Sequence, residues 1–430
     1  MRVLHVNSTD ISGGAARAAF RVMEAQREAG LDAGMAVNDA QSGDWTVTSP
    51  DTLRERIAVQ VRRGLVQRAT DWLSKPGTGM ASMALMRTRW PERFASLGAE
   101  VVNLHWINNE MLSVRDIARV SVPMVWTLHD MWAFCGSEHY TQSDRWRVGY
   151  TPSSRPLEAR GLDLDRWVWR RKQRAWRSPI HIVTPSRWLA DCVRQSALMS
   201  SWPVQVIPNP IDTAIWQPVD QRLARRLLGL PETEPLLLFG AMSGTRDPRK
   251  GYDLLRAALD KLRGRIEGLQ LVVFGERRPR EVPDMGFPVH YMGRLADDQT
   301  LKLLYSAADV MVIPSRMDNL PNTGVEAQVC GTPVAAFAVG GLPDIVEPGR
   351  SGYLARPFEA SDLAEGILWL LGDPERCAKM RFETAERAAR IHDPARVARA
   401  YAALYDELIE ARGPVSCRDD TDGPAAPGTP

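Results

Sequence analysis

Short apolar runs alternate with amphipathic segments along most of the chain. In the first half, residues 2–7 and 101–106 form such runs, as buried parallel strands do. In the second half the pattern restarts at residues 236–240 and returns at 269–274 and 309–313. Strands that alternate with helices predict parallel sheets covered by helices, which is an α/β fold with doubly wound, Rossmann-like topology.

The same reading predicts the remaining elements. Further strands are expected at residues 123–130, 181–184, 204–207, 289–292 and 333–337. Helices are expected at residues 15–28, 52–73, 187–196, from Tyr252 onward, 322–330, 360–371 and 394–411.

A rigid linker of Pro208, Asn209 and Pro210 separates the two series of strands. The chain has 430 residues, which is too long for one ordinary core. We therefore expect one domain at residues 1–210 and a second at 211–393, followed by a helix at 394–412. The Pro- and Gly-rich tail at 413–430 is expected to be disordered.

Composition narrows the class of protein. No apolar run approaches the roughly 20 residues needed to cross a bilayer, and the first residues lack the apolar core of a signal peptide. The five cysteines are scattered without metal-ligand spacing, which argues against zinc and against a disulfide framework. The net charge is +7 in residues 1–210 and −5 in residues 211–430, too weak a field to indicate nucleic acid. We expect a cytoplasmic protein.

Two basic segments each leave two interpretations open. In residues 52–73 apolar side chains recur every fourth position between arginines, so the helix either packs on its own domain, which we favour, or lies on an anionic membrane. In residues 166–177 the tryptophans at 167, 169 and 176 alternate with cations. They either anchor the protein at a membrane interface or pack inward.

The segment 314–337 carries the most specific candidate chemistry. Asp318 lies in a loop after a buried strand, and Glu326 lies one turn into the following helix. Free amides at a helix N-terminus hold phosphates or hydroxyls readily. We therefore expect a sugar-nucleotide site here, in which the loop and first helical turn contribute Asn319, Asn322, Thr323 and Gly324.

Other candidates follow other strands. Arg249 and Lys250 stand just before a helix and suit a diphosphate. Gly13 and Gly14 allow close approach of backbone to a ligand, or simply make a tight turn; they do not form the dinucleotide fingerprint, which argues against a nicotinamide cofactor. His129 ends a strand where an open α/β sheet binds ligands.

These motifs, taken in order, resemble those of the retaining GT-B glycosyltransferases of family 4. The similar stretches are Asp318 to Glu326 with the following Gly-Thr-Pro-Val, the linker at 209–212, and Arg249-Lys250-Gly251. The strings at 103–106 and 126–132 are similar to the colanic-acid and exopolysaccharide branch. The resemblance implies two Rossmann-like domains facing across a cleft, with the acceptor on the N-terminal side and the last helix crossing back.

The resemblance also implies roles. Glu326 would bind the ribose hydroxyls, Asp318 the donor sugar, and Arg249 with Lys250 the diphosphate. His129 would lie near the anomeric carbon, Gly13 and Gly14 would line the cleft, and the backbone near Gly293 would meet the base.

The implied reaction moves a hexose from a nucleotide-diphosphate sugar to a saccharide acceptor, expected to be lipid-linked, at the inner face of the membrane. We expect neither a metal ion nor another cofactor, because the cations and helix amides can stabilise the leaving phosphate. A subunit that only binds sugar nucleotides, and a GT-B epimerase or phosphorylase, are the alternatives.

Three departures from the family pattern stand out. Asp318 replaces a glutamate and is one methylene shorter. The family's arginine before the diphosphate motif has no counterpart, since Gly244 stands there with Arg246 nearby. The usually Cys-rich loop at 134–150 keeps one cysteine, Cys135.

Overall fold

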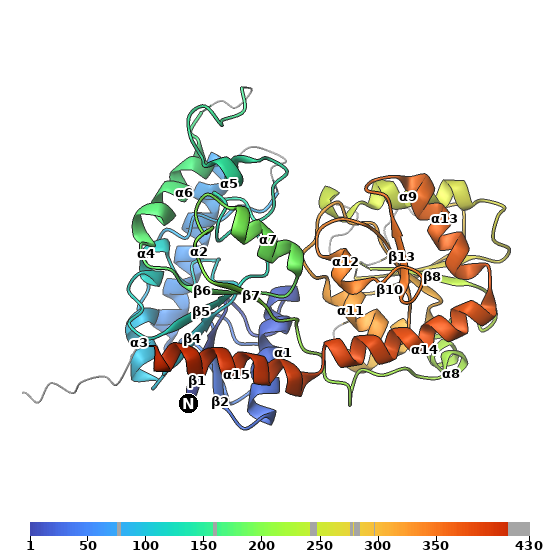
Figure 1. Ribbon diagram of the computed structural model, residues 1–430, viewed down its shortest axis with the longest axis horizontal. Coiled ribbons are helices and arrows are strands. Elements are labelled where there is room, and N and C mark those ends of the chain that lie inside the picture. The colour runs from blue at the N-terminus through green and yellow to red at the C-terminus, as the bar shows by residue number, and fades with distance from the viewer. Residues whose placement is uncertain are drawn as a thin grey trace, which may run out of the picture.

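Two parallel sheets lie side by side, and helices cover both faces of each sheet (Figure 1). The computed structural model describes residues 1–74, 79–157, 161–240, 247–275, 278, 284–295 and 297–411. The expected disordered tail at 413–430 and the departures at Gly244 and Arg246 lie outside these residues. The α/β, doubly wound fold expected from the sequence is confirmed.

The first sheet has seven parallel strands in the order β3-β2-β1-β4-β5-β6-β7. The chain order reverses between β1 and β4, so a crevice is expected where these strands end. The strands are β1 (Arg2–Val6), β2 (Asp32–Ala36), β3 (Val47–Thr48), β4 (Val101–Leu104), β5 (Met124–Thr127), β6 (His181–Thr184) and β7 (Val204–Val206). Its helices are α1 (Gly14–Glu28), α2 (Leu53–Leu73), α3 (Trp90–Ser96), α4 (Val114–Ile117), α5 (Arg145–Val148), α6 (Leu164–Ala175) and α7 (Arg187–Gln195).

The second sheet has six parallel strands in the order β10-β9-β8-β11-β12-β13, with the reversal between β8 and β11. The strands are β8 (Leu236–Gly240), β9 (Gln270–Phe274), β10 (Val289–Gly293), β11 (Val310–Ile313), β12 (Val334–Phe337) and β13 (Gly352–Ala355). The helical segments are α8 (Gln221–Leu228), η1 (Pro248–Lys250), α9 (Tyr252–Leu262), α10 (Asp298–Ala307), α11 (Asn322–Val329), α12 (Leu342–Ile345), α13 (Ala360–Leu371) and α14 (Pro374–Ile391).

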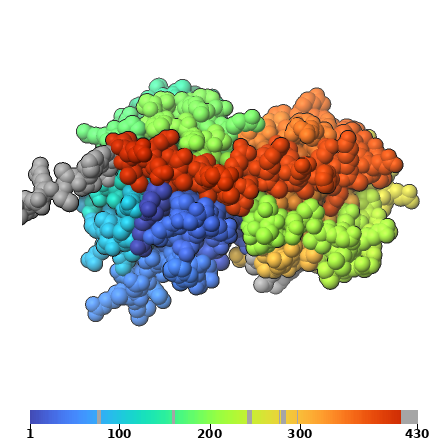
Figure 2. All heavy atoms as spheres, turned by 60° about the horizontal axis from the view of Figure 1, so that its bottom comes forward, coloured from blue at the N-terminus to red at the C-terminus, as the bar shows by residue number. Residues whose placement is uncertain are grey.

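The last helix, α15 (Pro394–Glu410), returns to the first sheet and packs beside α1. In Figure 2 the helices α14 and α15 form one band across both halves of the molecule. Tyr401 and Tyr405 of α15 are buried in the same apolar cluster as Val3 of β1 and Val101 of β4. The final helix is therefore part of the core of the first half.

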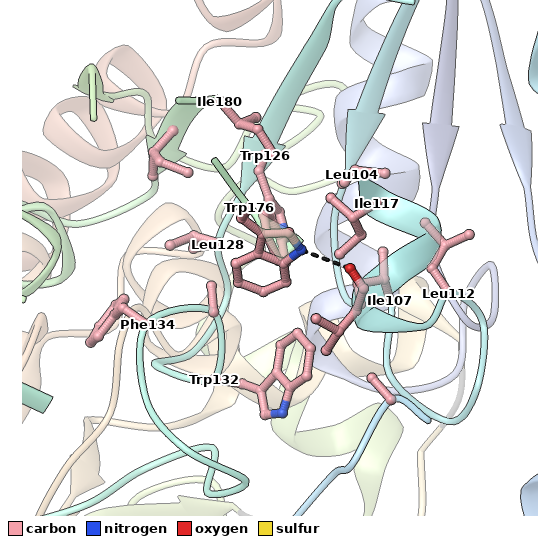
Figure 3. Close-up of a cluster of buried hydrophobic side chains, with 14 of the residues drawn as sticks. Leu104, Ile107, Leu112, Ile117, Trp126, Leu128, Trp132, Phe134, Trp176 and Ile180 are labelled. Atoms are coloured by element: carbon pink, nitrogen blue, oxygen red, sulfur yellow. Dashed lines mark hydrogen bonds between the residues drawn. The ribbon is translucent and has the colours of Figure 1, made fainter. Parts of the chain in front are cut away.

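Tryptophans build the centre of the first half (Figure 3). Trp126, Trp132 and Trp176 meet there, and the indole Nε1 of Trp176 donates to the carbonyl of Val114 at 2.8 Å. Trp169 is also buried. The interpretation of residues 166–177 as a membrane anchor with three outward tryptophans is therefore wrong, because two of those indoles fill the core.

Helix α2 was expected to pack its apolar stripe on its own domain, and the structure contradicts this expectation. Its buried residues are Val59, Val66 and Thr70, on one face of the helix. The apolar stripe that we expected to pack on the domain faces solvent instead. Each of the following side chains is more than half exposed: Leu53, Ile57, Val61, Leu65 and Trp72.

Candidate functional site

The candidate residues gather where strands of both sheets end. Lys250 follows β8 and Asp318 follows β11, the two strands between which the order of the second sheet reverses. His129 follows β5 of the first sheet. The carboxyl ends of parallel strands at such a reversal are the usual ligand position in α/β folds.

Asp318 is buried and is paired with both predicted phosphate-binding cations. Its Oδ2 lies 2.7 Å from Lys250 Nζ, and its Oδ1 lies 3.6 Å from Arg249 Nη1. Ser315 Oγ donates to Oδ2 at 3.3 Å. Burial alone would raise the pKa of the Asp318 carboxyl, but Lys250 and Arg249 outweigh it and hold the pKa below its ordinary value. Asp318 is therefore an anion with two cationic partners.

Local backbone geometry fixes these cations. Gly251 has φ +68°, and a Cβ there would lie 1.9 Å from the carbonyl oxygen of Pro314, so only glycine fits. Arg249 also donates to the carbonyl of Met317 at 3.1 Å. Its guanidinium lies 4.5 Å from the ring centroid of Tyr140, which comes from the first half of the chain. The diphosphate motif is thus in contact with both halves.

Glu326 is buried in α11 and is also paired. Tyr305 of α10 donates its hydroxyl to Oε2 at 3.0 Å. Arg21 of α1, from the first half, lies 2.9 Å from Oε1. The carboxylate that was expected to bind ribose hydroxyls therefore makes an ion pair between the two halves of the molecule.

The loop after β11 touches the first half directly. Ser186 Oγ donates to Asn319 Oδ1 at 2.5 Å, and Asn319 Nδ2 donates to the carbonyl of His129 at 3.2 Å. Asn322 Nδ2 donates to the carbonyl of Gly14 at 3.0 Å. The structure thus brings Gly14, His129, Asn319 and Asn322 together, and their expected contact with a ligand stays a prediction.

Two of the predicted residues at the start of α11 differ in their surroundings. Thr323 is partly buried in the first turn. Gly324 is buried, and a Cβ there would lie 2.8 Å from Ile313 Cδ1. The amide of Gly324 donates to the carbonyl of Pro321 at 3.0 Å. Gly324 was expected to offer its amide to a ligand; it instead closes the helical turn and permits close packing on β11.

Gly13 precedes a helix, and Gly293 ends a strand. Gly13 is the N-cap of α1 with φ +99°, and Gly293 ends β10 with φ +68°. The carbonyl of Gly293 accepts from the amide of Gly275, which follows β9, at 2.8 Å. The expected contact of Gly293 with a nucleobase remains a prediction.

His129 has one imidazole partner among the described residues, His105, whose Nδ1 lies 3.1 Å from His129 Nε2. Burial lowers the pKa of His129 to about 4, although the neighbouring Asp130 acts in the opposite direction. His129 is therefore uncharged near neutral pH.

Sequence patterns did not indicate several residues of this site. Arg21, Tyr305, Tyr140 and Ser186 all contact predicted residues. None belongs to a local motif, and each reaches its partner only because distant segments pack together. Arg21 and Tyr305 lie within helices, Ser186 caps the start of α7, and Tyr140 lies in a loop, so no shared sequence signal marks them.

No group of three or more His, Cys, Asp or Glu side chains among the residues that the structure describes is arranged to hold a metal ion. Within the same residues, every helix is too short or too polar to cross a bilayer.

Comparison with family models assigns both halves of the chain. Residues 12–215 match the model described as Glycosyltransferase Family 4, and residues 234–373 match Glycosyl transferases group 1. Only the short stretch 216–233 separates the two matches. Models of two glycosyltransferase families therefore match successive parts of the chain.

Curated relatives match this chain over part of their length. A D-inositol 3-phosphate glycosyltransferase 2 from Catenulispora acidiphila is 35% identical over 219 residues, which are 47% of this chain and 50% of the relative. A D-inositol 3-phosphate glycosyltransferase from Nocardia farcinica is 31% identical over 228 residues, 49% of this chain and 50% of that protein. The chain spans about half the length of the curated relatives it matches.

Solved structures share the fold of this chain over nearly its whole length. A sucrose-phosphate synthase from Thermosynechococcus elongatus superimposes with a TM-score of 0.65 at 20% identity, covering 95% of this chain and 99% of that one. HepE of Anabaena in complex with UDP-glucose gives a TM-score of 0.63 at 16% identity, covering 95% and 100%. The two-domain GT-B architecture is thereby confirmed.

Proposed function

We propose that the protein is a retaining glycosyltransferase that moves a hexose from a nucleotide-diphosphate sugar to a saccharide acceptor. One observation carries the proposal: Asp318, Lys250, Arg249 and the start of α11 meet at the strand reversal of the second sheet and face His129 of the first. The matched family models and the UDP-glucose bound to a structural neighbour support the same donor class.

The pairing of these residues suggests how the donor enters. A diphosphate is a better partner for Lys250 and Arg249 than a single carboxylate, because it offers more charge and more acceptor atoms. On binding, the phosphates would take over the two cations, and Asp318 would turn to the sugar hydroxyls. Ribose hydroxyls would likewise share Glu326 with Tyr305. The site exchanges protein partners for substrate partners.

The cations then serve the chemistry. As the glycosidic bond breaks, negative charge grows on the leaving phosphate and positive charge grows on the sugar. Cations fixed beside the phosphate stabilise that state without reorganisation, an effect worth about 3–4 kcal/mol for one removed donor group. We propose that Lys250 and Arg249 do this directly and that the reaction uses no metal ion.

A panel of UDP-, GDP- and ADP-sugars, read by thermal shift and then by donor turnover, tests the donor class. Binding raises the apparent stability as ln(1 + [L]/Kd) grows. Turnover that survives in both Glu326→Gln and Lys250→Met would refute the assigned site. Binding without turnover in any acceptor extract would instead favour the second candidate, a sugar-nucleotide-binding subunit, for which the shorter Asp318 is the supporting observation.

We also propose that the acceptor is a lipid-linked saccharide in the assembly of a surface or extracellular polysaccharide, reached from the cytoplasmic face of a membrane. The supporting observation is the outer face of α2, where apolar side chains more than half exposed alternate with exposed Arg54 and Arg68. Val66 of α2 and Val168 of α6 belong to one buried apolar cluster. Helix α6 and the loop before it carry three further exposed apolar side chains: Leu157, Leu162 and Trp167. Apolar side chains among arginines suit anionic lipid.

Sedimentation with vesicles of phosphatidylglycerol and phosphatidylcholine tests the membrane contact. The triple variant Ile57→Gln, Val61→Gln and Leu65→Gln should lose binding, and salt should weaken it in the wild type. Phe382→Gln is the matched control, since Phe382 is 73% exposed but lies on α14 in the other half. A wild type that stays in the supernatant, or that forms dimers through α2, would contradict the membrane assignment.

A further inference from the structure

Three histidines from neighbouring strands form one hydrogen-bonded row that ends at the candidate site. His5 lies in β1, His105 follows β4 and His129 follows β5, and these strands are adjacent in the first sheet. His5 Nδ1 lies 2.9 Å from His105 Nε2, and His105 Nδ1 lies 3.1 Å from His129 Nε2. Successive rings are stacked, with centroids 5.2 Å and 5.3 Å apart.

The buried end of the row is anchored on an amide. Gln26 Oε1 lies 3.0 Å from His5 Nε2, while Gln26 Nε2 donates to the hydroxyl of Tyr405 at 3.1 Å. An amide oxygen only accepts, so His5 must carry its proton on Nε2. A neutral imidazole has one N–H, so His5 Nδ1 accepts from His105 Nε2, and His105 Nδ1 accepts from His129 Nε2. Every ring is thereby the Nε2–H tautomer.

At the other end the row reaches the second half of the chain. The carbonyl of His129 accepts from Asn319, the neighbour of Asp318, so His129 lies against the candidate donor loop. Among the described residues no side chain or backbone group occupies His129 Nδ1. The fixed tautomer leaves that nitrogen as a lone pair. Burial lowers the pKa of all three imidazoles, which keeps the row neutral.

We propose that His5, His105 and Gln26 are positioning residues that hold His129 in its Nε2–H form, so that an uncharged imidazole presents the Nδ1 lone pair to the donor sugar. The inference rests on the proposed function. Positive charge grows on the sugar as the leaving phosphate departs, and an imidazolium beside it would oppose that charge. A lone pair accepts from a sugar hydroxyl and leaves the reacting carbon beside a neutral group.

The proposal explains why histidines occupy buried positions at which apolar side chains would cost less free energy to bury. His5 and His105 are fully or almost fully buried within a parallel sheet. Burying polar rings there is favourable only if every nitrogen finds a partner. Because Gln26 turns its oxygen toward His5 and its NH2 toward Tyr405, the two relayed imidazoles satisfy this condition in one direction, and this direction fixes the tautomer.

Nitrogen-15 labelling of the seven histidines, read by NMR, tests the tautomers directly. The wild type should show His5, His105 and His129 protonated on Nε2. Gln26→Met keeps the side-chain volume but removes the acceptor, and His5→Phe cuts the row if the first variant misfolds. Either should mix the tautomers of His129 and lower kcat by about tenfold or more, the size typical when the partner that orients an imidazole is removed. The KM for the donor should change little.

His181→Phe on the adjacent strand β6 is the matched control and should alter neither property. The proposal is overturned if His129 carries its proton on Nδ1, or if kcat falls in Gln26→Met while the His129 tautomer is unchanged. If the wild type turns over no donor, the proposed function fails, but NMR still tests the positioning role. The role is supported if all three histidines carry their proton on Nε2 and only the His129 signal shifts when a nucleotide sugar is added. It is overturned if the His129 signal does not respond.

Discussion

Replacing Lys250 by methionine separates the structural role of this cation from its proposed role in catalysis. Lys250 Nζ lies 2.7 Å from Asp318 Oδ2, so the gross Coulomb attraction at an effective dielectric constant of about 20 is about 6 kcal/mol. Desolvation offsets much of it. Lys250 is 23% exposed and Arg249 stays 3.6 Å from the same carboxylate, so we expect a net loss of about 2 kcal/mol of unfolding free energy.

The activity should respond differently from the stability. Loss of one cation from the leaving phosphate should lower kcat/KM by about 100- to 1,000-fold. In Lys250→Met/Asp318→Asn the unpaired carboxylate is gone, so the stability should return to within about 1 kcal/mol of the wild type. The activity should stay low, because the phosphate still lacks its cation.

Both effects can be measured by urea unfolding and donor turnover on the wild type, Lys250→Met, Lys250→Met/Asp318→Asn and a control variant. Lys261→Met is the matched control, since Lys261 is an exposed lysine in α9, the helix that follows Lys250. If the double variant regains wild-type kcat/KM, Lys250 is only the counter-ion of Asp318. The assignment of the diphosphate site would then be wrong.

Three further predictions concern contacts around the site. Arg21→Met leaves the Glu326 carboxylate buried without its cation and should cost about 3 kcal/mol in urea unfolding, most of it recovered by adding Glu326→Gln; equal stability of wild type and single variant would contradict this. Gly341→Ala would place a Cβ 1.6 Å from the carbonyl oxygen of Asn319, so the loop after β11 must shift. Donor turnover should therefore fall while Tm changes little. Full activity would show that the loop tolerates the shift. Burial and a nearby carboxylate raise the pKa of Glu138 to about 8, so the folded state holds a proton that the unfolded state releases above pH 4.5. Stability should therefore fall as pH rises from 4.5 toward 8, and Glu138→Gln should flatten this slope in a plot of Tm against pH.

Apolar runs were sufficient to predict most strands, because a strand buried on both faces has no polar alternation to confuse the pattern. Strands β6 and β8 begin and end where the sequence indicated. Strand β2 was missed because its small residues, Asp-Ala-Gly-Met-Ala, lack the β-branched enrichment of its neighbours. Helices α10 and α14 were also missed, although each starts at an aspartate N-cap that the sequence displays.

The candidate site likewise contains residues that local sequence patterns indicate and residues that only long-range packing brings in. Asp318, Lys250 and Glu326 could be predicted as site residues because each belongs to a short local motif. Arg21 was not found, since nothing in the sequence near position 21 refers to position 326. For α2 the periodicity predicted the helix but not its orientation. An apolar stripe specifies that one face avoids water, and it does not specify whether protein or lipid covers that face.

The crossing of α15 also sets an order in time. During synthesis the first half leaves the ribosome long before residues 394–410, yet Tyr401 and Tyr405 fill its core and Tyr405 holds Gln26. The first half therefore waits, with an uncovered apolar surface, until the whole second half has been made. A fragment of residues 1–210 would lack both this cover and the anchor of the histidine row. The two halves cannot be exchanged or expressed as independent modules unless α15 travels with the first.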